Sequence, residues 1–484
     1  MRAALALLIC VRALAQDGSI PENPRELKFA PLAYTPPRAA DFRHKLANGA
    51  VAYLVEDHDL PLINIGVLIR TGAFLDPPGK RGLAQLTGSQ IRAGGTRTRP
   101  PAVFDEEAAF LAAGLGSGIG DLEGNASLNC LSKDIDAGLA LFADMLRNPG
   151  FAEDRLKLAR NQMLQAMERR NDSTESIEAR EFQRLLRGAH FSAMPVTKAT
   201  LEAITRDDLI DFHRRYYCPA NFIFAVSGDF RIADMLARLE KAFRDWPNRT
   251  EPIPPVPKPD FIPKPGVYVV DKRDVNQGRV RMGHLGVMIT NPDHLALSVM
   301  NGVLGGSGFT SRITSRVRSD EGLAYDAGSS FNHGNFYEGT FSVHFQSKNP
   351  AVAQAIAIVK EEIEKIRSAP VSEEELKTEV NYVIESFPRR FATAAARASQ
   401  FASDEYIKLP ADYWQRYRER IAALTPADIQ RVARQYLHPD RMVTLVVGNL
   451  EAIRQGNPDR PQFPFPSDFV QIPLPDPLTM VYPN

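Results

Sequence analysis

The chain has 484 residues, of which 44% are hydrophobic and 24% are charged, a balance typical of a folded protein with two or three domains. Its 58 lysines and arginines equal its 58 aspartates and glutamates, so the formal net charge is zero. This composition excludes a largely disordered chain and offers no electrostatic basis for binding nucleic acid or an anionic membrane surface.

The first 15 residues predict a signal peptide. Arg2 gives the start a positive charge, residues 3–11 form an apolar run, and the small residues Ala13 and Ala15 stand at the −3 and −1 positions of a cleavage site. No later stretch reaches the roughly 18 uninterrupted apolar residues of a membrane-spanning helix. We therefore expect a protein that is periplasmic or otherwise exported and that has no membrane span.

Strands and helices alternate along the first part of the chain. Apolar and β-branched runs predict strands at Val51–Glu56, Leu62–Thr71 and Asn125–Ser132. Helical periodicity predicts helices at Leu83–Arg92, Asp134–Arg147 and Ala152–Leu186. Glycine stands at every second position from residue 114 to residue 120. This pattern is typical of a flexible loop, to which we assign no role: Gly114, Gly116, Gly118 and Gly120.

The second part of the chain repeats this alternation. Strands are predicted at 267–271, 279–288, 325–332 and 338–346, and helices near 349–367 and 372–406. Ser372 and Glu375 form a capping box at the start of the last helix, and Pro388 is expected to kink that helix. The mixture predicts an α+β fold in which each domain has a mixed or antiparallel sheet with helices packed on one face.

Two segments of the chain are similar at a fixed spacing of 220 residues, namely 203–229 and 423–449. In each, a threonine precedes an amphipathic helix, a proline ends it, and a β-branched strand leads to a glycine turn. The matched pairs are Thr205 and Thr425, Tyr216 and Tyr436, Pro219 and Pro439, and Gly228 and Gly448. A weaker similarity at a spacing of 211 residues joins 82–95 to 293–306. The repeats predict two homologous domains.

The repeats and the distribution of proline set the expected domain limits. Eight prolines between residues 247 and 265 predict a stiff linker, and a second proline-rich stretch predicts a surface tail. The expected segments are a signal peptide at 1–15, an N-terminal extension at 16–40, an N-domain at 41–247, a linker at 248–265, a C-domain at 266–455 and a tail at 456–484.

Two motifs carry a family resemblance. The segment LANGAVAYLVEDHDLPLINIGVLIRTGAFLDPPGKRGLAQL resembles the opening of the pitrilysin/insulinase zinc metallopeptidases, which include mitochondrial processing peptidase. The segment VMNGVLGGSGFTSRITSRVRSDEGLAYDAGSSF resembles the more specific signature of their C-terminal domain. The resemblance covers about residues 28–455 and implies paired homologous domains.

Active members of that family carry the zinc motif H-x-x-E-H, in which two histidines on one helical face bind zinc and the glutamate handles the proton of the water. The resemblance places Gln85 and Ser89 at the histidine positions and Gly88 at the glutamate position. Ala166 falls at the third ligand, which is a glutamate in active members. The chain has nine histidines, no two of them three or four residues apart, so no helix supplies a pair of imidazoles. We therefore expect no metal or other cofactor on this chain.

Arg318 and Tyr325 match the R-x-x-x-G-L-x-Y signature of the family's C-domain. In active members these residues reach the active site from the second domain or a second subunit and help to hold the scissile carbonyl. A guanidinium and a phenol suit that role, because both donate hydrogen bonds to oxygen as it gains negative charge. Without this context the residues are read as a surface ion pair of Arg318 with Asp320 or Glu321 and as a half-buried core tyrosine.

Gly305 and Gly306, together with Gly302 and Gly308, form a second candidate for substrate binding. They fall where the non-catalytic subunit of processing peptidase has a glycine-rich loop implicated in substrate handling. Glycine permits close backbone approach and mobility. The alternative is a helix C-cap followed by a turn, and the sequence leaves both interpretations open.

These features predict a zinc-free, non-catalytic subunit of a two-component peptidase. Its partner would be a homologous chain with its own H-x-x-E-H and the zinc, and its substrate an unfolded peptide held with the help of Arg318 and Tyr325. The alternative is a purely structural or peptide-binding homologue without a role in proteolysis. An active enzyme with unrelated chemistry is a third hypothesis, and no nucleophile elbow, P-loop or dinucleotide fingerprint supports it.

Overall fold

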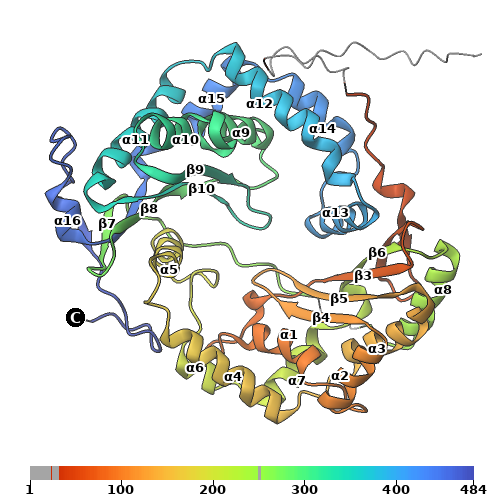
Figure 1. Ribbon diagram of the computed structural model, residues 1–484. Coiled ribbons are helices and arrows are strands. Elements are labelled where there is room, and N and C mark those ends of the chain that lie inside the picture. Colours follow the sequence, from red (N-terminus) through yellow and green to blue (C-terminus); the bar gives the residue numbers. More distant parts are fainter. Residues whose placement is uncertain (1–22, 24–31, 249–251, 484) are drawn as a thin grey trace, which may run out of the picture. The chain divides into compact units, whose positions relative to one another are not determined.

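Two six-stranded sheets form the framework of the computed structural model (Figure 1). The structure describes Asn23, residues 32–248 and residues 252–483, so the predicted signal peptide lies outside the described residues. Residues 36–484 form one compact unit, and residues 1–35 form a separate unit. We describe the larger unit and refer to residues 36–248 as the first half and residues 252–483 as the second half.

The first sheet is mixed. Its β2 and β6 are parallel neighbours, although about 170 residues separate them, and all its other neighbours are antiparallel. The spatial order is β1 (Arg43–Lys45), β2 (Val51–Glu56), β6 (Phe222–Gly228), β3 (Leu62–Ile69), β5 (Gly124–Leu131) and β4 (Gly114–Ile119). The glycine-rich β4 is the edge strand.

The second sheet repeats this order in five of its six strands, and its outer strand β12 differs, because it comes from the C-terminal end and is parallel to its neighbour β7. Its β7 and β11 are parallel, as β2 and β6 are, and β11 comes from the second copy of the repeated segment. The spatial order is β12 (Val470–Gln471), β7 (Gly266–Asp271), β11 (Val443–Gly448), β8 (Gln277–Leu285), β10 (Thr340–Lys348) and β9 (Ala324–Asn332). The shared order shows that the two sequence repeats are two copies of one architecture.

One face of each sheet is covered by helices of its own half. Alternate residues of β3, among them Ile63, Ile65 and Val67, are buried in the core, because successive side chains of a strand point to opposite faces. The covering helices of the first half are α1 (Leu83–Ala93), α3 (Ile135–Arg147), α7 (Arg206–Tyr216) and α8 (Ile232–Phe243). Those of the second half are α9 (His294–Asn301), α11 (Val352–Ser368), α15 (Pro426–Tyr436) and α16 (Leu450–Gln455). The predicted α+β class is confirmed.

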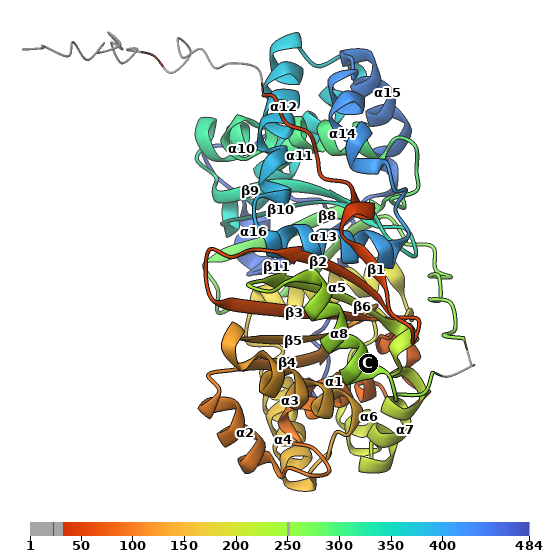
Figure 2. The same cartoon turned by 90° about the vertical axis from the view of Figure 1, so that its right-hand side faces the viewer.

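Each half also lends one helix to the opposite sheet. Helix α5 (Thr174–Arg187) packs on β8 and β11, and α13 (Ala394–Ile407) packs on β2 and β6 (Figures 1 and 2). Ile177, Phe182 and Leu186 of α5 are buried against the second sheet. Since a fully buried apolar side chain contributes about 1.5–3 kcal/mol, this contact is a substantial link between the halves.

Carboxylates strengthen both exchanged contacts. On α5 the fully buried Glu178 accepts a hydrogen bond of 2.8 Å from Nε of Arg279 and pairs with Arg281, both on β8. On α13, Glu405 pairs with Arg43 and accepts a hydrogen bond of 2.8 Å from the hydroxyl of Tyr53. Each carboxylate lies on a helix of one half and its partners lie on the sheet of the other half. The halves are therefore joined by hydrogen bonds and ion pairs as well as by apolar contacts.

Three predicted elements were wrong. The single helix at 152–186 is two helices, α4 (Glu153–Glu168) and α5, because the chain turns and Ser173 caps a new helix. Pro388 does not kink a long helix but separates α12 (Glu373–Ser386) from α13, since the chain forms a 3₁₀ turn there. The glycines at 114–118 are not a flexible loop but strand β4, where a Cβ atom at Gly116 would lie 2.8 Å from the hydroxyl oxygen of Ser127. The capping box of Ser372 and Glu375 is confirmed.

Candidate functional site

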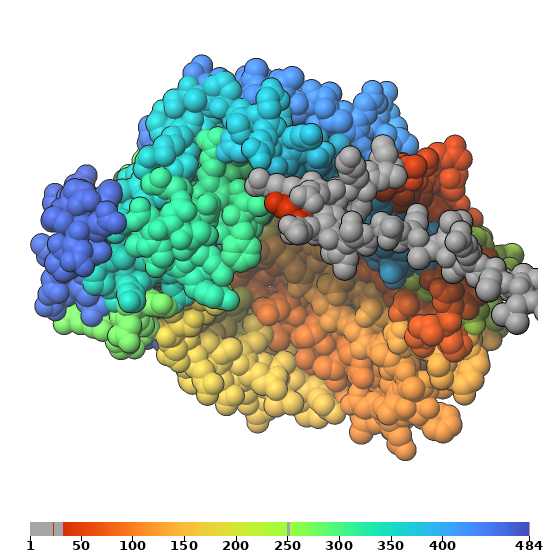
Figure 3. All heavy atoms as spheres, turned by 45° about the horizontal axis from the view of Figure 1, so that its top comes forward, coloured from red at the N-terminus to blue at the C-terminus, as the bar shows by residue number. Residues whose placement is uncertain are grey.

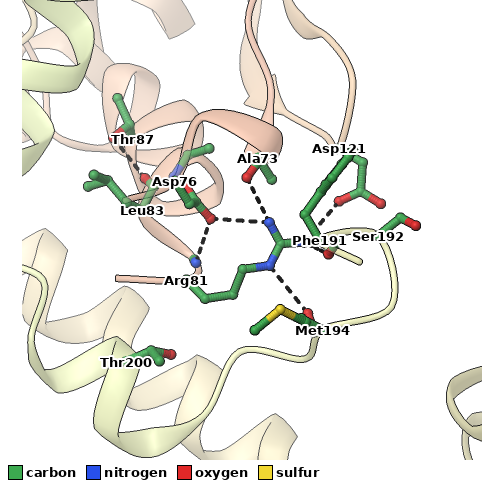
Figure 4. Close-up of polar contacts among 12 residues, drawn as sticks. Ala73, Asp76, Arg81, Leu83, Thr87, Asp121, Phe191, Ser192, Met194 and Thr200 are labelled. Carbon is green, nitrogen blue, oxygen red and sulfur yellow. Dashed lines mark hydrogen bonds and ion pairs between the residues drawn. The ribbon is translucent and has the colours of Figure 1, made fainter. Parts of the chain in front are cut away.

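Helix α1, which carries the positions of the lost zinc motif, is anchored at its start by Asp76 and Arg81 (Figure 4). The Asp76 carboxylate accepts hydrogen bonds from the backbone N–H groups of Gly82, at 2.9 Å, and Ala84, at 2.7 Å. These bonds satisfy donors that the first turn of a helix leaves free. Burial nevertheless raises the pKa of Asp76 above its ordinary value.

The Arg81 guanidinium ties three backbone carbonyls from two segments to this helix start (Figure 4). Its Nη1 donates to the carbonyl of Ala73 at 2.8 Å, its Nη2 to that of Phe191 at 2.6 Å, and its Nε to that of Met194 at 3.2 Å. Arg81 also faces the carboxylates of Asp76 and Asp121, each at 3.4 Å. Helix α1 is therefore held in a fixed position.

The three motif positions on α1 differ in exposure. Gln85 and Ser89 are exposed, whereas Gly88 is buried against the edge strand β4. A Cβ atom at Gly88 would overlap the backbone nitrogen of Ile119 and lie 2.6 Å from the carbonyl carbon of Gly118. Strand β4 thus fills the space that a glutamate at position 88 would need.

The carbonyl of Gly88 and the hydroxyl of Ser89 form hydrogen bonds to β4 and within α1. The hydroxyl of Ser117 on β4 donates to the carbonyl of Gly88 at 2.5 Å, and the hydroxyl of Ser89 donates to that of Leu86 at 3.0 Å. Ala166, on α4, is exposed and offers only a methyl group.

An amide, a glycine, a hydroxyl bonded to its own helix and a methyl group do not fit a zinc site, which requires imidazole, thiolate or carboxylate ligands. Within residues 32–248 and 252–483, no group of three or more histidine, cysteine, aspartate or glutamate side chains is arranged to hold a metal ion.

Arg318 and Tyr325 are brought together by the structure, and Phe309 joins them. Arg318 lies in a π-helical turn at Ser315–Asp320, and Tyr325 lies near the start of β9. The Arg318 guanidinium carbon is 4.6 Å from the ring centroid of Tyr325 and 4.4 Å from that of Phe309. Tyr325 is 83% exposed and Phe309 is 65% exposed. The three side chains form a cation–π stack at the surface of the second half.

This arrangement excludes both alternatives considered for the pair. Glu321 accepts a hydrogen bond from Gln354 at 3.1 Å and faces Arg460 at 3.6 Å instead of Arg318. In the described part of the chain, Arg318 forms neither an ion pair nor a hydrogen bond. The exposed Tyr325 is not a core residue. With ring contacts as its partners, the guanidinium keeps N–H groups for another acceptor.

Sequence reasoning missed Phe309. It lies nine residues before Arg318, outside the R-x-x-x-G-L-x-Y signature, and the turn at Gly308–Thr310 brings it to the stack. The one signal in the sequence is an aromatic residue within a run of glycine, serine and threonine, and that signal is too common to be assigned.

Gly305 and Gly306 lie in a π-helical turn, Gly302–Gly306, that continues α9. Gly305 is buried, and a Cβ atom there would lie 2.7 Å from the backbone nitrogen of Ser329 on β9. Gly306 is exposed. The segment is therefore a packed helix end followed by a turn, and of the two glycines only Gly306 presents its backbone to solvent.

Glu379 on α12 packs against the turn at Gly302–Gly306 and bonds to Ser307, which follows it. Sequence reasoning missed this residue as well. A Cβ atom at Gly302 would overlap the Glu379 carboxylate, which accepts a hydrogen bond from the hydroxyl of Ser307. Burial raises the pKa of Glu379 above its ordinary value. The contact fixes the turn from which Phe309 extends.

The helix-free parts of the two sheets face each other across a hollow between the halves (Figures 1 and 3). On the first sheet this face is polar and uncharged, with Asn64, Asn125, Ser127 and Asn129 exposed. Nδ2 of Asn129 donates to Oδ1 of Asn64 at 2.6 Å. On the second sheet the face includes Ser330, His344 and Gln346. His344 lies 3.6 Å from the exposed carboxylate of Asp326. The polar groups of the two faces can exchange hydrogen bonds with a peptide backbone.

Two family sequence models match the chain. One, described as insulinase (peptidase family M16), matches residues 51–200, and the other, described as the peptidase M16 inactive domain, matches residues 203–383. Together they cover both halves, including α1 in the first match and the Phe309–Arg318–Tyr325 stack in the second.

Bacterial proteins are among those similar to this chain in sequence. The non-peptidase homolog YmxG of Helicobacter pylori is 25% identical over 427 residues, which are 85% of this chain and 95% of that protein. An uncharacterized zinc protease of Rickettsia bellii is 23% identical over 340 residues, which are 69% of this chain and 79% of that protein.

Solved structures share the fold. The peptidase M16 inactive domain from Pseudomonas fluorescens superposes with a TM-score of 0.75 at 24% identity, covering 84% of this chain and 97% of that chain. A protease from Helicobacter pylori gives a TM-score of 0.72 at 21% identity, covering 84% and 98%. At these identities the structures establish the fold alone. Within residues 32–248 and 252–483, every helix is too short or too polar to cross a membrane.

Proposed function

Because this chain belongs to the insulinase family of peptidases, family M16, we propose that it is the zinc-free subunit of a two-component peptidase. The comparisons support an inactive M16-like homologue with a non-catalytic role. The two-component proposal rests on a difference between the halves in the functional groups that they keep. Gln85, Gly88 and Ser89 offer no zinc ligand or base, whereas Arg318 and Tyr325 are together and exposed.

In this proposal the partner is a homologous subunit with an intact H-x-x-E-H, and it holds the zinc that activates water. This chain contributes the in-plane N–H groups of Arg318 and the hydroxyl of Tyr325 to a carbonyl oxygen of the peptide. The rings of Phe309 and Tyr325 hold the guanidinium flat, so the donors are oriented before substrate arrives. The polar sheet faces and the edge strands β4 and β9 offer binding surface to an extended, unfolded peptide.

The signal peptide expected at residues 1–15 places this assembly outside the cytoplasm in the proposal. The alternative function, a structural or peptide-binding homologue without a role in proteolysis, is supported by the polar faces of the hollow alone and makes no use of the stack of Phe309, Arg318 and Tyr325.

The experiment that tests the proposal combines the chain with an M16 protein from the same genome that carries H-x-x-E-H. We expect the two chains to co-elute in size-exclusion chromatography at micromolar concentration. The mixture should cleave an unfolded peptide faster than the partner does alone, and this chain alone should cleave none. Independent elution with no change in the partner's rate would exclude the two-component peptidase.

A further inference from the structure

A pocket of about 400 Å³ lies in the helical layer of the first half, on the side of that half away from the sheet face that borders the hollow. Its wall is built from the end of α3, the loop at 148–151, helix α7 and Trp246. An antiparallel bridge between Thr96 and Pro149 fixes the base of that loop. Small-molecule sites in proteins have volumes of about 300–1,000 Å³, so the pocket is large enough for a small ligand.

Three arginines in this wall are held by neutral oxygens only. Arg206 donates from Nε to the carbonyl of Phe151 at 2.8 Å and from Nη2 to that of Gly150 at 2.9 Å. Arg147 donates to the carbonyl of Asp245 at 2.6 Å, and Arg97 donates to the side-chain oxygen of Asn148. A guanidinium has five N–H donors, so each arginine is oriented by one or two bonds and keeps further donors.

The positive charge of these three arginines is not balanced at the pocket. None of the three forms an ion pair within the described residues, and no described residue that lines the pocket is an aspartate or glutamate. A fourth arginine in the wall, Arg214, is paired with Asp211 at 2.6 Å. The nearby Asp144 is paired with Arg99 at 2.8 Å. The pocket therefore favours an anion.

Aromatic rings form the rest of the wall. Phe151, Tyr217 and Trp246 are buried, and the His213 ring stacks on that of Tyr217 with a centroid distance of 4.9 Å. Nε2 of His213 is 2.7 Å from the carbonyl of Leu146, and a carbonyl only accepts, so this nitrogen carries a proton. Phe151 and Tyr217 lie almost completely buried behind the wall and fix it, and the aromatic surface that a flat group can contact is that of His213 and Trp246, which are 9% and 8% exposed.

We propose that this arginine pocket, defined by Arg97, Arg147, Arg206, His213, Tyr217 and Trp246, binds an oxyanion carried on an aromatic ring. The phosphate or carboxylate group takes the free N–H donors of the arginines, and the ring packs on the aromatic wall. The inference does not depend on the function proposed above, because it uses no residue of α1 or of the Phe309–Arg318–Tyr325 stack.

Isothermal titration of the full chain with four probes tests this inference. Phenyl phosphate and benzoate should bind with one site per chain, inorganic phosphate at least about tenfold more weakly, and benzyl alcohol not at all in the low millimolar range. The two ring-bearing probes distinguish the sources of the oxyanion, since the tighter binder identifies phosphate or carboxylate. Added salt should weaken both, because the attraction is electrostatic.

Variants locate the site. Arg97→Gln and Arg147→Gln should each weaken phenyl phosphate about tenfold, since each removes a charged donor. We leave Arg206 intact because it holds two backbone carbonyls. The matched control is Arg273→Gln, an exposed arginine outside the pocket, which should leave affinity unchanged. Equal affinity for benzyl alcohol and phenyl phosphate, no binding of either anion, or unchanged affinity in both folded pocket variants would overturn the inference.

Discussion

The guanidinium of Arg318 lies against two exposed rings, and the proposed role of the second half rests on this placement. A surface arginine without partners samples many rotamers, and fixing it costs side-chain entropy. Here Phe309 and Tyr325 restrict it before any ligand is present. In the proposed function the stack is an oriented donor, and its expected effect on a bound carbonyl can be tested one atom at a time.

Tyr325→Phe is the cleanest test at this scale, because it deletes a hydroxyl and keeps the ring against Arg318. In the two-chain peptidase we expect kcat to fall by about 100-fold, the lower end of the loss that follows removal of one oxyanion donor. Steady-state kinetics of the mixed complex measure it, with co-elution as the check that assembly is intact. An unchanged kcat in both Tyr325→Phe and Arg318→Gln would leave this chain a structural component only.

Gly88 gives a second prediction, on stability. Alanine raises helix propensity by about 1 kcal/mol, but its Cβ would overlap β4, and overpacking costs about 1–3 kcal/mol or more. We expect Gly88→Ala to lower the free energy of unfolding by about 1–2 kcal/mol in urea. Ser89→Ala, at the exposed neighbouring position, is the control and should change it by less than about 0.5 kcal/mol. A stabilised Gly88→Ala protein would show that β4 can move away from α1.

Among the elements, those with local signals were predictable from the sequence and those set by tertiary contact were not. Strand β2 and the capping box of α12 were predicted at their observed positions, because β-branched runs and Ser372 with Glu375 act locally. The exchange of α5 and α13 has no local signal, since an amphipathic helix has the same pattern whichever sheet covers it. Gly88 shows the same limit, because its need for glycine depends on the backbone of Gly118 and Ile119, about 30 residues away in the sequence.

Some residues of the candidate site could likewise be predicted from the sequence, and others could not. Arg318 and Tyr325 were found through a linear motif, whereas Phe309 and Glu379 contribute through contacts that folding creates. The domain limits and the roles of Gly305 and Gly306 stay predictions.

Helix α5 carries a prediction about its buried carboxylate. Removing one partner of a buried ion pair costs about 3–5 kcal/mol, because the other charges lose their compensation. Glu178→Gln should therefore lower the free energy of unfolding by about 3 kcal/mol, since Arg279 and Arg281 would face a neutral amide. Glu175→Gln is the matched control on the same helix. Its carboxylate is 71% exposed at 3.4 Å from Arg279, and the expected loss is below about 1 kcal/mol. Equal losses in the two variants would refute the buried link.

At the scale of the whole molecule, the reciprocal exchange of helices predicts that the halves associate without the chain that connects them. Between the halves, α5 packs on the second sheet and α13 on the first. The loop after β9 adds further contacts, since Arg187 donates to the carbonyl of Glu338 at 3.0 Å and stacks on Tyr337. Residues 252–256, by contrast, are largely exposed and lie outside any helix or strand. The covalent connection and the non-covalent one are therefore separable by experiment.

The last prediction concerns a protein in which the chain between the halves has been cut. We expect that a protease site placed within residues 252–256 is cut in the folded protein, and that the two fragments still co-elute at micromolar concentration. They should also unfold in one urea transition, because each sheet is covered by a helix of the other fragment. The uncut protein with the same inserted site is the control. Adding Glu178→Gln to the cut protein should promote dissociation, since it weakens α5 on the second sheet. Fragments that separate without denaturant would show that the exchanged helices do not hold the halves together.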